Sequence, residues 1–375
     1  MNARCLLAML LCGLSACSEK NETEPTSGSG GAGGSTVSTG GQGGGPSYAD
    51  AVRAANWVKL ESAPSVGGGA KQDDIFMLDR DRGFVASGPN QSIYATTDGG
   101  ASWSPIFMND GTYFRAVLFT NDQRGFAGNI GAGLSPSISD PNVIYATENG
   151  GADWAPVTSI SGPAPEGICN FTALDDMTLF AVGRANGPAH LLTSSDGGTT
   201  WTSVDLGQWL TMAIDVHFRT PTEGIVAGMG TSSRCTIART TDGGATFEQV
   251  FESQTPGSLC WKLSFPSTDI GYVAVQDTAG GPGTFGKTTD GGATWQELPL
   301  PINESYGSIG VGFVTDDIGW MASEDATLPV YRTFDGGMTW EVEPVLVAPI
   351  NRFRFVDANT AYAVGANVWK LEVDY

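Results

Sequence analysis

The most constraining feature of this sequence is an eight-residue phrase that recurs six times. It follows the pattern T-x-D-G-G-x-[T/S]-W, and its first copy reads TTDGGASW at residues 96–103. The third position carries an aspartate, or once an asparagine, at intervals of 51, 47, 46, 48 and 45 residues: Asp98, Asn149, Asp196, Asp242, Asp290 and Asp335. A near-constant period of this length indicates a chain built from equal supersecondary units.

A second phrase precedes each of these copies, and it occurs seven times. It is an apolar strand ending in Phe, a polar turn, and then an aromatic residue or Ile followed by small residues, as in KLSFPSTDIGYVAV from Lys262. The seventh occurrence is followed by ANVWKLEVDY, without a copy of the first phrase. Residues 56–60, NWVKL, resemble the short strand directly after each copy. We therefore expect an N-terminal strand to complete the C-terminal unit and close a ring.

These observations predict an all-β fold: a seven-bladed β-propeller of four-stranded antiparallel blades over residues 51–375. The eight-residue phrase forms the hairpin between the third and fourth strands of a blade. Its carboxylate accepts hydrogen bonds from turn amides, and its glycines tolerate left-handed backbone. Asn149 keeps a side-chain acceptor, so that copy should still form the hairpin. The last position is expected to pack between neighbouring sheets: Trp103, Trp154, Trp201, Phe247, Trp295 and Trp340.

The phrase resembles the bacterial neuraminidase repeat, or Asp-box, of sialidases, family 74 xyloglucanases, sortilin-type receptors and photosystem II assembly factors. The upstream phrase, with its G-[FYW]-x-[AV]-x-G ending, looks most like the photosystem II assembly-factor propellers and their non-photosynthetic lipoprotein relatives. The resemblance implies the propeller fold and places the boxes at the rim, away from the binding face. It is highly specific for fold and poorly specific for function.

Residues 1–17 resemble a bacterial lipoprotein signal peptide. A charged start at Arg4 precedes an apolar stretch too short to span a bilayer, and the segment ends in the lipobox-like LSAC, in which Cys17 takes the lipid. The alternative is an ordinary signal peptide cleaved near Ala16. Residues 18–50 are rich in Gly and Ser and are expected to form a flexible linker. The sequence thus predicts export and a lipid anchor in the cell envelope, with Ser18 favouring the outer membrane on its periplasmic or surface face.

The formal net charge of −21 argues against nucleic acid as a partner, because phosphate binding needs a basic surface. It also argues against docking on anionic lipid head groups, so contact with a membrane is expected only through the N-terminal lipid. We expect a monomer.

Two enzyme classes can be weighed against the residues. A sialidase needs an arginine triad, a Tyr–Glu pair and a Phe/Tyr-Arg-Ile-Pro phrase, and this sequence lacks that phrase. Xyloglucanases of this type use two propellers that face a cleft, each with a carboxylate. The pair Asp215-x-His217 suggests a catalytic or metal site, but two alternate residues of a strand also share a face and line a channel together. The sequence favours no catalytic residue, no metal and no cofactor.

Three cysteines remain in the domain: Cys169, Cys235 and Cys260. In an oxidising compartment a disulfide between Cys235 and Cys260 is the favoured pairing, because both open strands of adjacent blades on the same face.

Polar residues on the innermost strands are the candidate ligand face of the channel: Arg115, Asn170, Asp215, His217, Lys262, Arg352 and Arg354. One interpretation is an internal ion-pair network that stabilises the ring. The other is a basic pocket for an acidic peptide or an anionic glycan. The function expected from the sequence is non-enzymatic: a protein-binding or assembly module with a protein or peptide partner. The alternative is an extracellular module that binds or cleaves carbohydrate.

Overall fold

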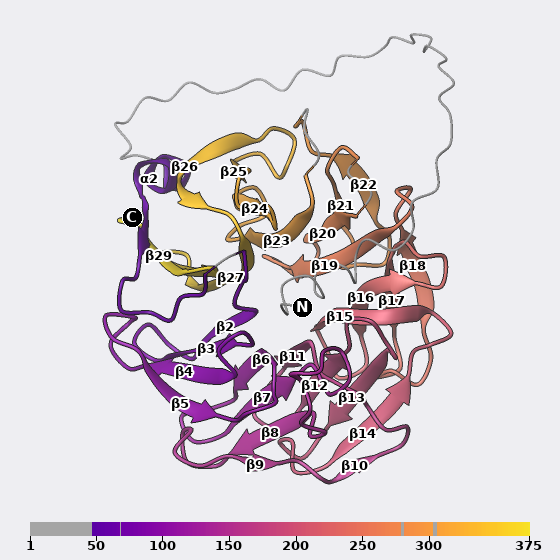
Figure 1. Cartoon of the computed structure of the whole chain (residues 1–375). Helices are drawn as coiled ribbons and strands as arrows, with labels where there is room; N and C mark the ends of the chain where they lie inside the picture. The colour runs from indigo at the N-terminus through magenta and orange to yellow at the C-terminus, as the bar shows by residue number, and fades with distance from the viewer. Residues whose placement is uncertain (1–46, 68, 279–280, 303–305) are drawn as a thin grey trace.

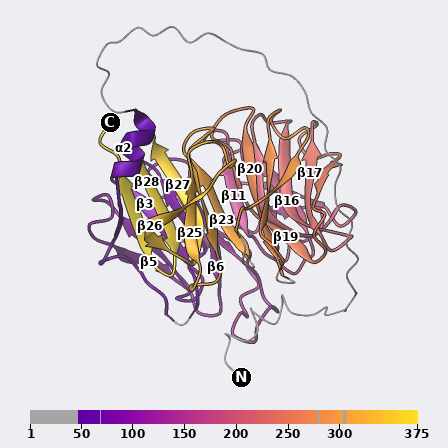
Figure 2. The same ribbon diagram turned by 90° about the horizontal axis from the view of Figure 1, so that it is seen from above.

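A computed structural model describes residues 47–67, 69–278, 281–302 and 306–375. Its strands form seven sheets around a central axis (Figure 1), and a view from the side shows them as a thick disc (Figure 2). The predicted signal peptide with Cys17, and nearly all of the predicted linker, lie outside the described residues. The seven-bladed propeller predicted from the repeat is confirmed.

The strands follow chain order outward from the axis, except that β10 and β1 are outermost in blades 3 and 7, and the innermost strands of neighbouring blades contact one another. Blade 1 comprises β2 (Asp74–Met77), β3 (Gly83–Ser87), β4 (Ser92–Thr96) and β5 (Ser104–Met108). Blade 2 comprises β6 (Phe114–Phe119), β7 (Gly125–Asn129), β8 (Ile144–Thr147) and β9 (Ala155–Pro156). Blade 3 comprises β11 (Asn170–Ala173), β12 (Leu179–Gly183), β13 (His190–Ser194), β14 (Trp201–Asp205) and an added strand, β10 (Ile160–Ser161).

The remaining blades have four strands each. Blade 4 comprises β15 (Leu210–Phe218), β16 (Gly224–Gly230), β17 (Cys235–Thr240) and β18 (Glu248–Glu252). Blade 5 comprises β19 (Ser258–Ser264), β20 (Gly271–Asp277), β21 (Thr284–Thr288) and β22 (Gln296–Pro299). Blade 6 comprises β23 (Ser308–Phe313), β24 (Gly319–Ser323), β25 (Pro329–Thr333) and β26 (Glu341–Val347). Blade 7 comprises β27 (Ile350–Asp357), β28 (Thr360–Gly365), β29 (Val368–Glu372) and β1 (Trp57–Lys59).

Blade 3 departs from the predicted four-stranded antiparallel pattern. The segment that crosses over from blade 2 runs along its outer edge, where β10 pairs with β14 in parallel. The outermost strand of blade 2, β9, has only two residues, so the chain leaves that blade early. The added strand covers an edge that would otherwise present unpaired backbone groups.

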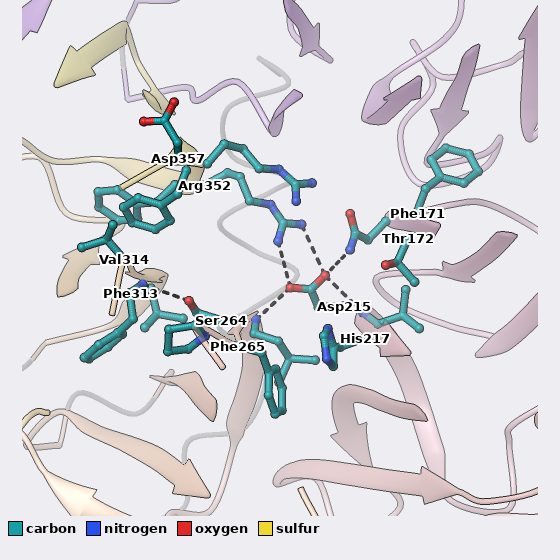
Figure 3. Close-up of a pocket in the computed structure, with 18 of the residues that line it drawn as sticks. Phe171, Thr172, Asp215, His217, Ser264, Phe265, Phe313, Val314, Arg352 and Asp357 are labelled. Carbon is teal, nitrogen blue, oxygen red and sulfur yellow. Dashed lines mark hydrogen bonds and ion pairs between the residues drawn. The ribbon is translucent and has the colours of Figure 1, made fainter. Parts of the chain in front are cut away.

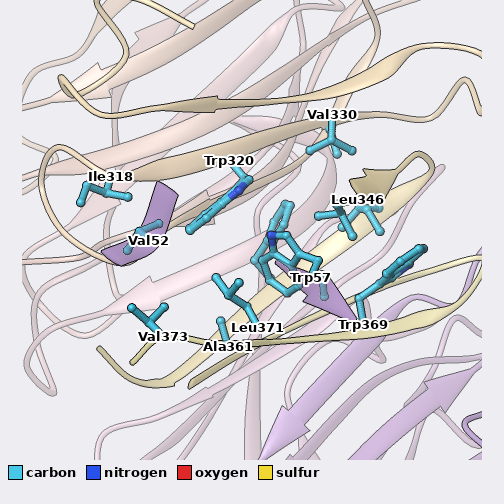
Figure 4. Packing of buried hydrophobic residues seen from close by; sticks show 14 of the residues in the cluster. Val52, Trp57, Ile318, Trp320, Val330, Leu346, Ala361, Trp369, Leu371 and Val373 are labelled. Carbon is cyan, nitrogen blue, oxygen red and sulfur yellow. The ribbon is translucent and has the colours of Figure 1, made fainter. Parts of the chain in front are cut away.

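The N-terminal strand closes the ring, as predicted. β1 pairs with β29 in antiparallel register, with Trp57 opposite Leu371. The Trp57 side chain is 2% exposed and makes edge contacts with Trp320 at 5.6 Å and with Phe353 at 5.9 Å between ring centroids. Figure 4 shows this cluster, in which residues from both ends of the domain pack together. Burial of one aromatic ring therefore joins the two ends of the domain.

Each box lies between the third and fourth strands of its blade. In blade 4 the Thr246 amide donates to the Asp242 carboxylate at 2.8 Å, and the Gly244 amide donates to the Thr240 hydroxyl at 2.9 Å. Gly244 has a φ of +95°, which explains the requirement for glycine. The box with Asn149 keeps the same geometry, since its side-chain oxygen accepts from the Asp153 amide at 2.9 Å.

The aromatic residue of each box contacts the preceding blade. The Trp295 ring of blade 5 lies 6.2 Å from Phe251 of blade 4. The Trp340 ring of blade 6 lies 5.7 Å from Phe285 of blade 5, and in blade 3 Trp201 is 1% exposed against Phe126 of blade 2. The boxes therefore join neighbouring sheets through aromatic packing.

A helix and the C-terminus occupy the place where blade 7 would carry its box. Helix α2 (Tyr48–Ala54) leads into β1, and the chain ends just after β29. The Tyr48 ring lies 5.3 Å from that of Tyr375, and the Tyr48 hydroxyl donates to the Ala358 carbonyl. The helix begins two residues before the predicted end of the linker at residue 50, because Ser47 and Asp50 form a capping box there.

Candidate functional site

Bulges in the innermost strands organise the central channel. The pairing of β6, β15, β19, β23 and β27 with their neighbours shifts register at one or two positions in each strand. A bulge re-aims the side chains around it. We align the blades by counting back from the residue that ends the apolar strand of the upstream phrase: Met77, Phe119, Ala173, Phe218, Phe265, Phe313 and Phe355.

Two levels matter for function. The floor ring is the level at the third residue back from that position: Asp74, Ala116, Asn170, Asp215, Lys262, Gly310 and Arg352. The plug ring is one residue deeper: Asp73, Arg115, Cys169, Ile214, Trp261, Ile309 and Asn351.

The plug ring fills the channel. Cys169, Ile214, Trp261 and Ile309 belong to one buried apolar cluster. The Trp261 indole donates to the Asn351 side chain at 2.6 Å, across from blade 5 to blade 7. These contacts bring non-adjacent blades together on the axis, so the channel is a cup with a closed bottom at this level.

The cup above the floor ring is a pocket of about 470 Å³ (Figure 3). Its polar lining includes Asn170, Asp215, His217, Arg352 and Arg354. Its apolar walls come mainly from Phe and Val side chains at the ends of the inner strands: Phe171, Val216, Phe265, Val311, Phe313, Val314, Phe353 and Phe355. The pocket combines apolar walls with a polar floor, which is the usual make-up of a ligand site.

Asp215 lies at the centre of the floor, and its carboxylate is fully engaged. It accepts from the Arg352 guanidinium at 3.0 and 3.3 Å, from the Leu263 amide at 2.8 Å, and from the Asn170 side chain. Burial alone would raise the pKa of Asp215, but the charges of Arg352 and Lys262 and the hydrogen bonds from Arg352 and Leu263 hold it below its usual value. Asp215 therefore ties blades 3, 5 and 7 to blade 4.

Two arginines of β27 share a second buried carboxylate. Arg352 Nε lies 3.2 Å from Asp74, and Arg354 Nη2 donates to Asp74 at 3.4 Å. Arg354 also donates to the Ile75 carbonyl at 2.9 Å, which fixes its orientation. Its side chain is 30% exposed, against 5% for Arg352. Arg354 is therefore the floor cation that an incoming ligand can reach.

His217 forms part of the wall. Its ring stacks on Phe265 at 4.2 Å and is half-buried. Burial lowers the pKa of His217 to about 4, with Asp215 opposing that effect and Arg219 adding to it. At neutral pH the imidazole is uncharged.

Arg115 and Lys262 do not line the pocket. Arg115 lies in the plug ring, 3.4 Å from Asp73 and 5.0 Å from the Trp261 ring. Lys262 lies in the floor ring and is 0% exposed. Burial lowers the pKa of Lys262 to about 7, with the charge of Arg352 as the next cause.

The seven candidate residues thus separate into two groups: five line the pocket and two are buried beneath it. The three arginines of the set are engaged in an internal ion-pair network, with Asp73, Asp74 and Asp215 as partners. Sequence reasoning missed both Asp73 and Asp74, as well as the apolar walls. The sequence carried a signal for the walls, because the apolar strand of the upstream phrase ends in Phe in most blades, and these side chains lie at the mouth of the channel.

The pocket opens on the face that carries the boxes. Its rim includes Pro266 and Ala358, which lie in turns between first and second strands. Box backbones hydrogen-bond to these same turns, as with the Gly291 amide and the Asp269 carbonyl at 2.8 Å in blade 5. The resemblance implied that the boxes lie away from the binding face, whereas this pocket opens on the face that carries them.

The structure contains a disulfide between Cys235 and Cys260, and Cys169 is a buried free thiol. Over the described residues, no cluster of His, Cys, Asp and Glu has the arrangement of a metal site. None of the helices in that part of the chain is both long and apolar enough to cross a membrane.

Comparison with known proteins places the fold but not the function. No family model and no curated protein matches the chain. Among solved structures, that of YCF48 bound to D1 peptide is 16% identical, with a TM-score of 0.61 over 85% of this chain and 97% of that one. A streptogramin B lyase is 12% identical, with a TM-score of 0.64 over 85% and 98% of the two chains.

The GH74 xyloglucanase from Xanthomonas campestris is also similar, at 16% identity and a TM-score of 0.58. The match covers 84% of this chain but 53% of the enzyme. At these identities the likeness shows a shared seven-bladed architecture, which hosts binding proteins and enzymes alike.

Proposed function

We propose that this protein is a non-enzymatic binding or assembly module that captures a peptide segment of a protein partner in the box-face pocket. The observation that carries the proposal is the low pKa of the two carboxylates in the pocket. Asp215 and Asp357 both line the pocket, and both have a pKa below the usual value. For Asp357 the main cause is a hydrogen bond from Arg80.

A glycosidase of the usual kind needs one carboxylic acid with a raised pKa to protonate the leaving group. Two ionised, hydrogen-bonded carboxylates do not supply that acid. His217, with a pKa of about 4, is uncharged at neutral pH and does not replace it. The pocket is thus better equipped to bind than to catalyse.

The pocket favours a peptide with an apolar side chain beside an acidic group. Phe265 and Phe355 are half-buried in its wall and offer ring faces to an apolar side chain. Arg354, fixed by Ile75 and Asp74, presents a preorganised guanidinium to a carboxylate. The similarity to a propeller whose structure was solved with a peptide supports the same class of ligand.

We also propose that the protein is exported and held in the cell envelope by a lipid on Cys17, with residues 18–46 as tether. The composition of residues 1–17 supports this part of the proposal. Labelling cells with a radioactive or clickable fatty acid tests it: the wild-type chain should carry label, and the Cys17→Ala chain should not.

A pull-down from envelope extract tests the binding function. The wild-type domain should retain one stoichiometric partner, and the Arg354→Ala, Phe355→Ala double variant should lose it. Met338→Ala, on the box hairpin of blade 6 where Met338 is 81% exposed, is the matched control and should behave like wild type. Retention of the partner by the double variant would remove the pocket from the proposal.

The carbohydrate alternative has a specific observation of its own, since aromatic walls also stack on sugar rings. A glycan array and a panel of fluorogenic glycosides distinguish it. Turnover of a glycoside by the wild-type domain, lost in the Phe355→Ala variant, would replace the peptide proposal by a carbohydrate-active one.

A further inference from the structure

We propose that the channel holds a small monovalent anion, of the size of chloride, beneath the pocket and between Lys262, Arg115 and Arg352. This site lies under the floor ring and is separate from the pocket, so it does not depend on the peptide proposed above. The proposal stands on unpaired donors, on a charge count and on the packing around them.

Two of the three cations have buried nitrogens without a hydrogen-bond partner in the protein: Nζ of Lys262, and Nε and Nη2 of Arg115. Arg352 Nε lies 3.2 Å from Asp74 in an ion pair. The three residues are 0%, 2% and 4% exposed. A charged donor shielded from water and left unpaired is among the costlier features that a folded protein can retain. Three such atoms, at the step between the floor ring and the plug ring, indicate an acceptor beside them.

The three cations are close to one another through shared neighbours. Arg115 lies against the Trp261 ring, and the next residue along β19 is Lys262. The following residue, Leu263, donates its amide to Asp215, which is also the partner of Arg352. Lys262 therefore lies between the two arginines, at the step from the floor ring to the plug ring.

The charges around Lys262 do not balance. Four cations, Lys262, Arg115, Arg352 and Arg354, face three carboxylates, those of Asp73, Asp74 and Asp215. Lys71 lies farther from Lys262, binds Asp73 at 2.9 Å and has Glu324 as a charged neighbour. Lys71 and Glu324 together add one positive and one negative charge, so they leave the balance unchanged. When Lys262 is protonated, one positive charge remains in excess. A single monovalent anion neutralises it.

The surroundings favour a small ion. Trp261, Ile214 and Ile309 pack below, and the Asp215–Arg352 ion pair closes the level above. A phosphate or sulfate dianion would bring more negative charge than the excess. Burial also lowers the pKa of Lys262, and an adjacent anion would oppose that effect by favouring the protonated amine.

Thermal unfolding in matched salts provides the first test. At pH 6.5 and constant ionic strength, replacing sodium gluconate by sodium chloride should raise the Tm of the wild-type domain by about 2 °C or more, because an ion that binds only the folded state stabilises it. In Lys262→Met, which keeps the side-chain volume, the chloride effect should vanish. In Lys59→Met, which removes a surface lysine, it should persist.

Diffraction provides the second test and does not depend on a variant that folds. Crystals of the wild-type domain grown in sodium bromide should show an anomalous peak between Lys262, Arg115 and Arg352. A water in that place, bonded to the unpaired oxygens of Asn170 and Asp73, would overturn the proposal. So would equal Tm values in chloride and gluconate.

Discussion

Lys262 should make the stability of the domain depend on pH in an unusual direction. The pKa of this buried amine falls from 10.5 to about 7 on folding. Because the unfolded chain holds the proton more tightly, stability should rise with pH between about 7 and 10.5 and be lowest at and below about 7. At about 1.4 kcal/mol per pH unit, the full effect is roughly 5 kcal/mol.

The variant Lys262→Met isolates this effect, because the other titrating groups are common to both proteins. In gluconate buffer, the variant should be more stable than wild type at pH 7. A one-proton linkage calculation with these two pKa values gives a wild-type gain of about 2 kcal/mol between pH 7 and pH 9. The difference between the two proteins in the free energy of unfolding should narrow by that amount.

Urea unfolding followed by tryptophan fluorescence measures the difference at each pH. Two curves of stability against pH that run parallel from pH 7 to pH 9 would refute the reasoning, because a Lys262 of ordinary pKa stays protonated in both states over that range. A variant less stable than wild type at every pH in this buffer would also refute the reasoning, because it would show that the folded protein stabilises the amine without chloride.

Four further changes probe the scaffold, each measured by urea or thermal unfolding. Asp215→Asn leaves Arg352 without its main partner and should lower the free energy of unfolding by about 3–5 kcal/mol. A loss below about 1 kcal/mol would mean that Arg352 does not need the charge of Asp215. Reduction of the Cys235–Cys260 disulfide, which spans 25 residues, should cost about 3 kcal/mol, and no change on adding reductant would contradict the bond. Gly292→Ala, at a φ of +88°, should cost about 1–2 kcal/mol, with Ala293→Gly as a neighbouring control. Trp57→Ala should cost about 3–5 kcal/mol by weakening ring closure, and an unaltered midpoint would show that β1 does not hold the ends together.

The number of blades and the closure of the ring were predictable because their determinants are local. A box needs an aspartate or asparagine, two glycines with positive φ and an aromatic residue within eight positions, so each copy predicts one hairpin wherever it occurs. The seventh upstream phrase without a box left one blade short of a strand, and residues 56–60 resembled the missing piece. β1 beside β29 is the result.

The glycine of the upstream phrase also has a local cause. A Cβ on Gly271 would come within 2.3 Å of the Phe265 ring, and one on Gly224 within 2.5 Å of the Phe218 ring. The aromatic residue that ends the inner strand lies flat over the glycine that begins the next one. This contact explains why the two residues recur together at a fixed spacing.

The levels of the channel were harder to predict, because bulges are set by packing between blades. A shift of one residue changes the direction in which a strand's side chains point. The sequence analysis placed Arg115 and Arg352 on one candidate face. Arg115 is four residues before Phe119, whereas Arg352 is three residues before Phe355, so Arg115 falls one level deeper, beside Trp261.

Pairing across the channel was also beyond sequence reasoning. Asp215 and Arg352 are 137 residues apart and come from blades 4 and 7. No local pattern around either residue identifies the other as its partner. The sequence therefore left open whether the cations form an internal ion-pair network or line a basic pocket for a ligand. The structure shows three of them neutralised from below by Asp73, Asp74 and Asp215, with Arg354 alone of that group kept 30% exposed. A ligand that enters the pocket therefore meets one oriented cation within apolar walls, and that restricts its chemistry more than a broad basic surface would.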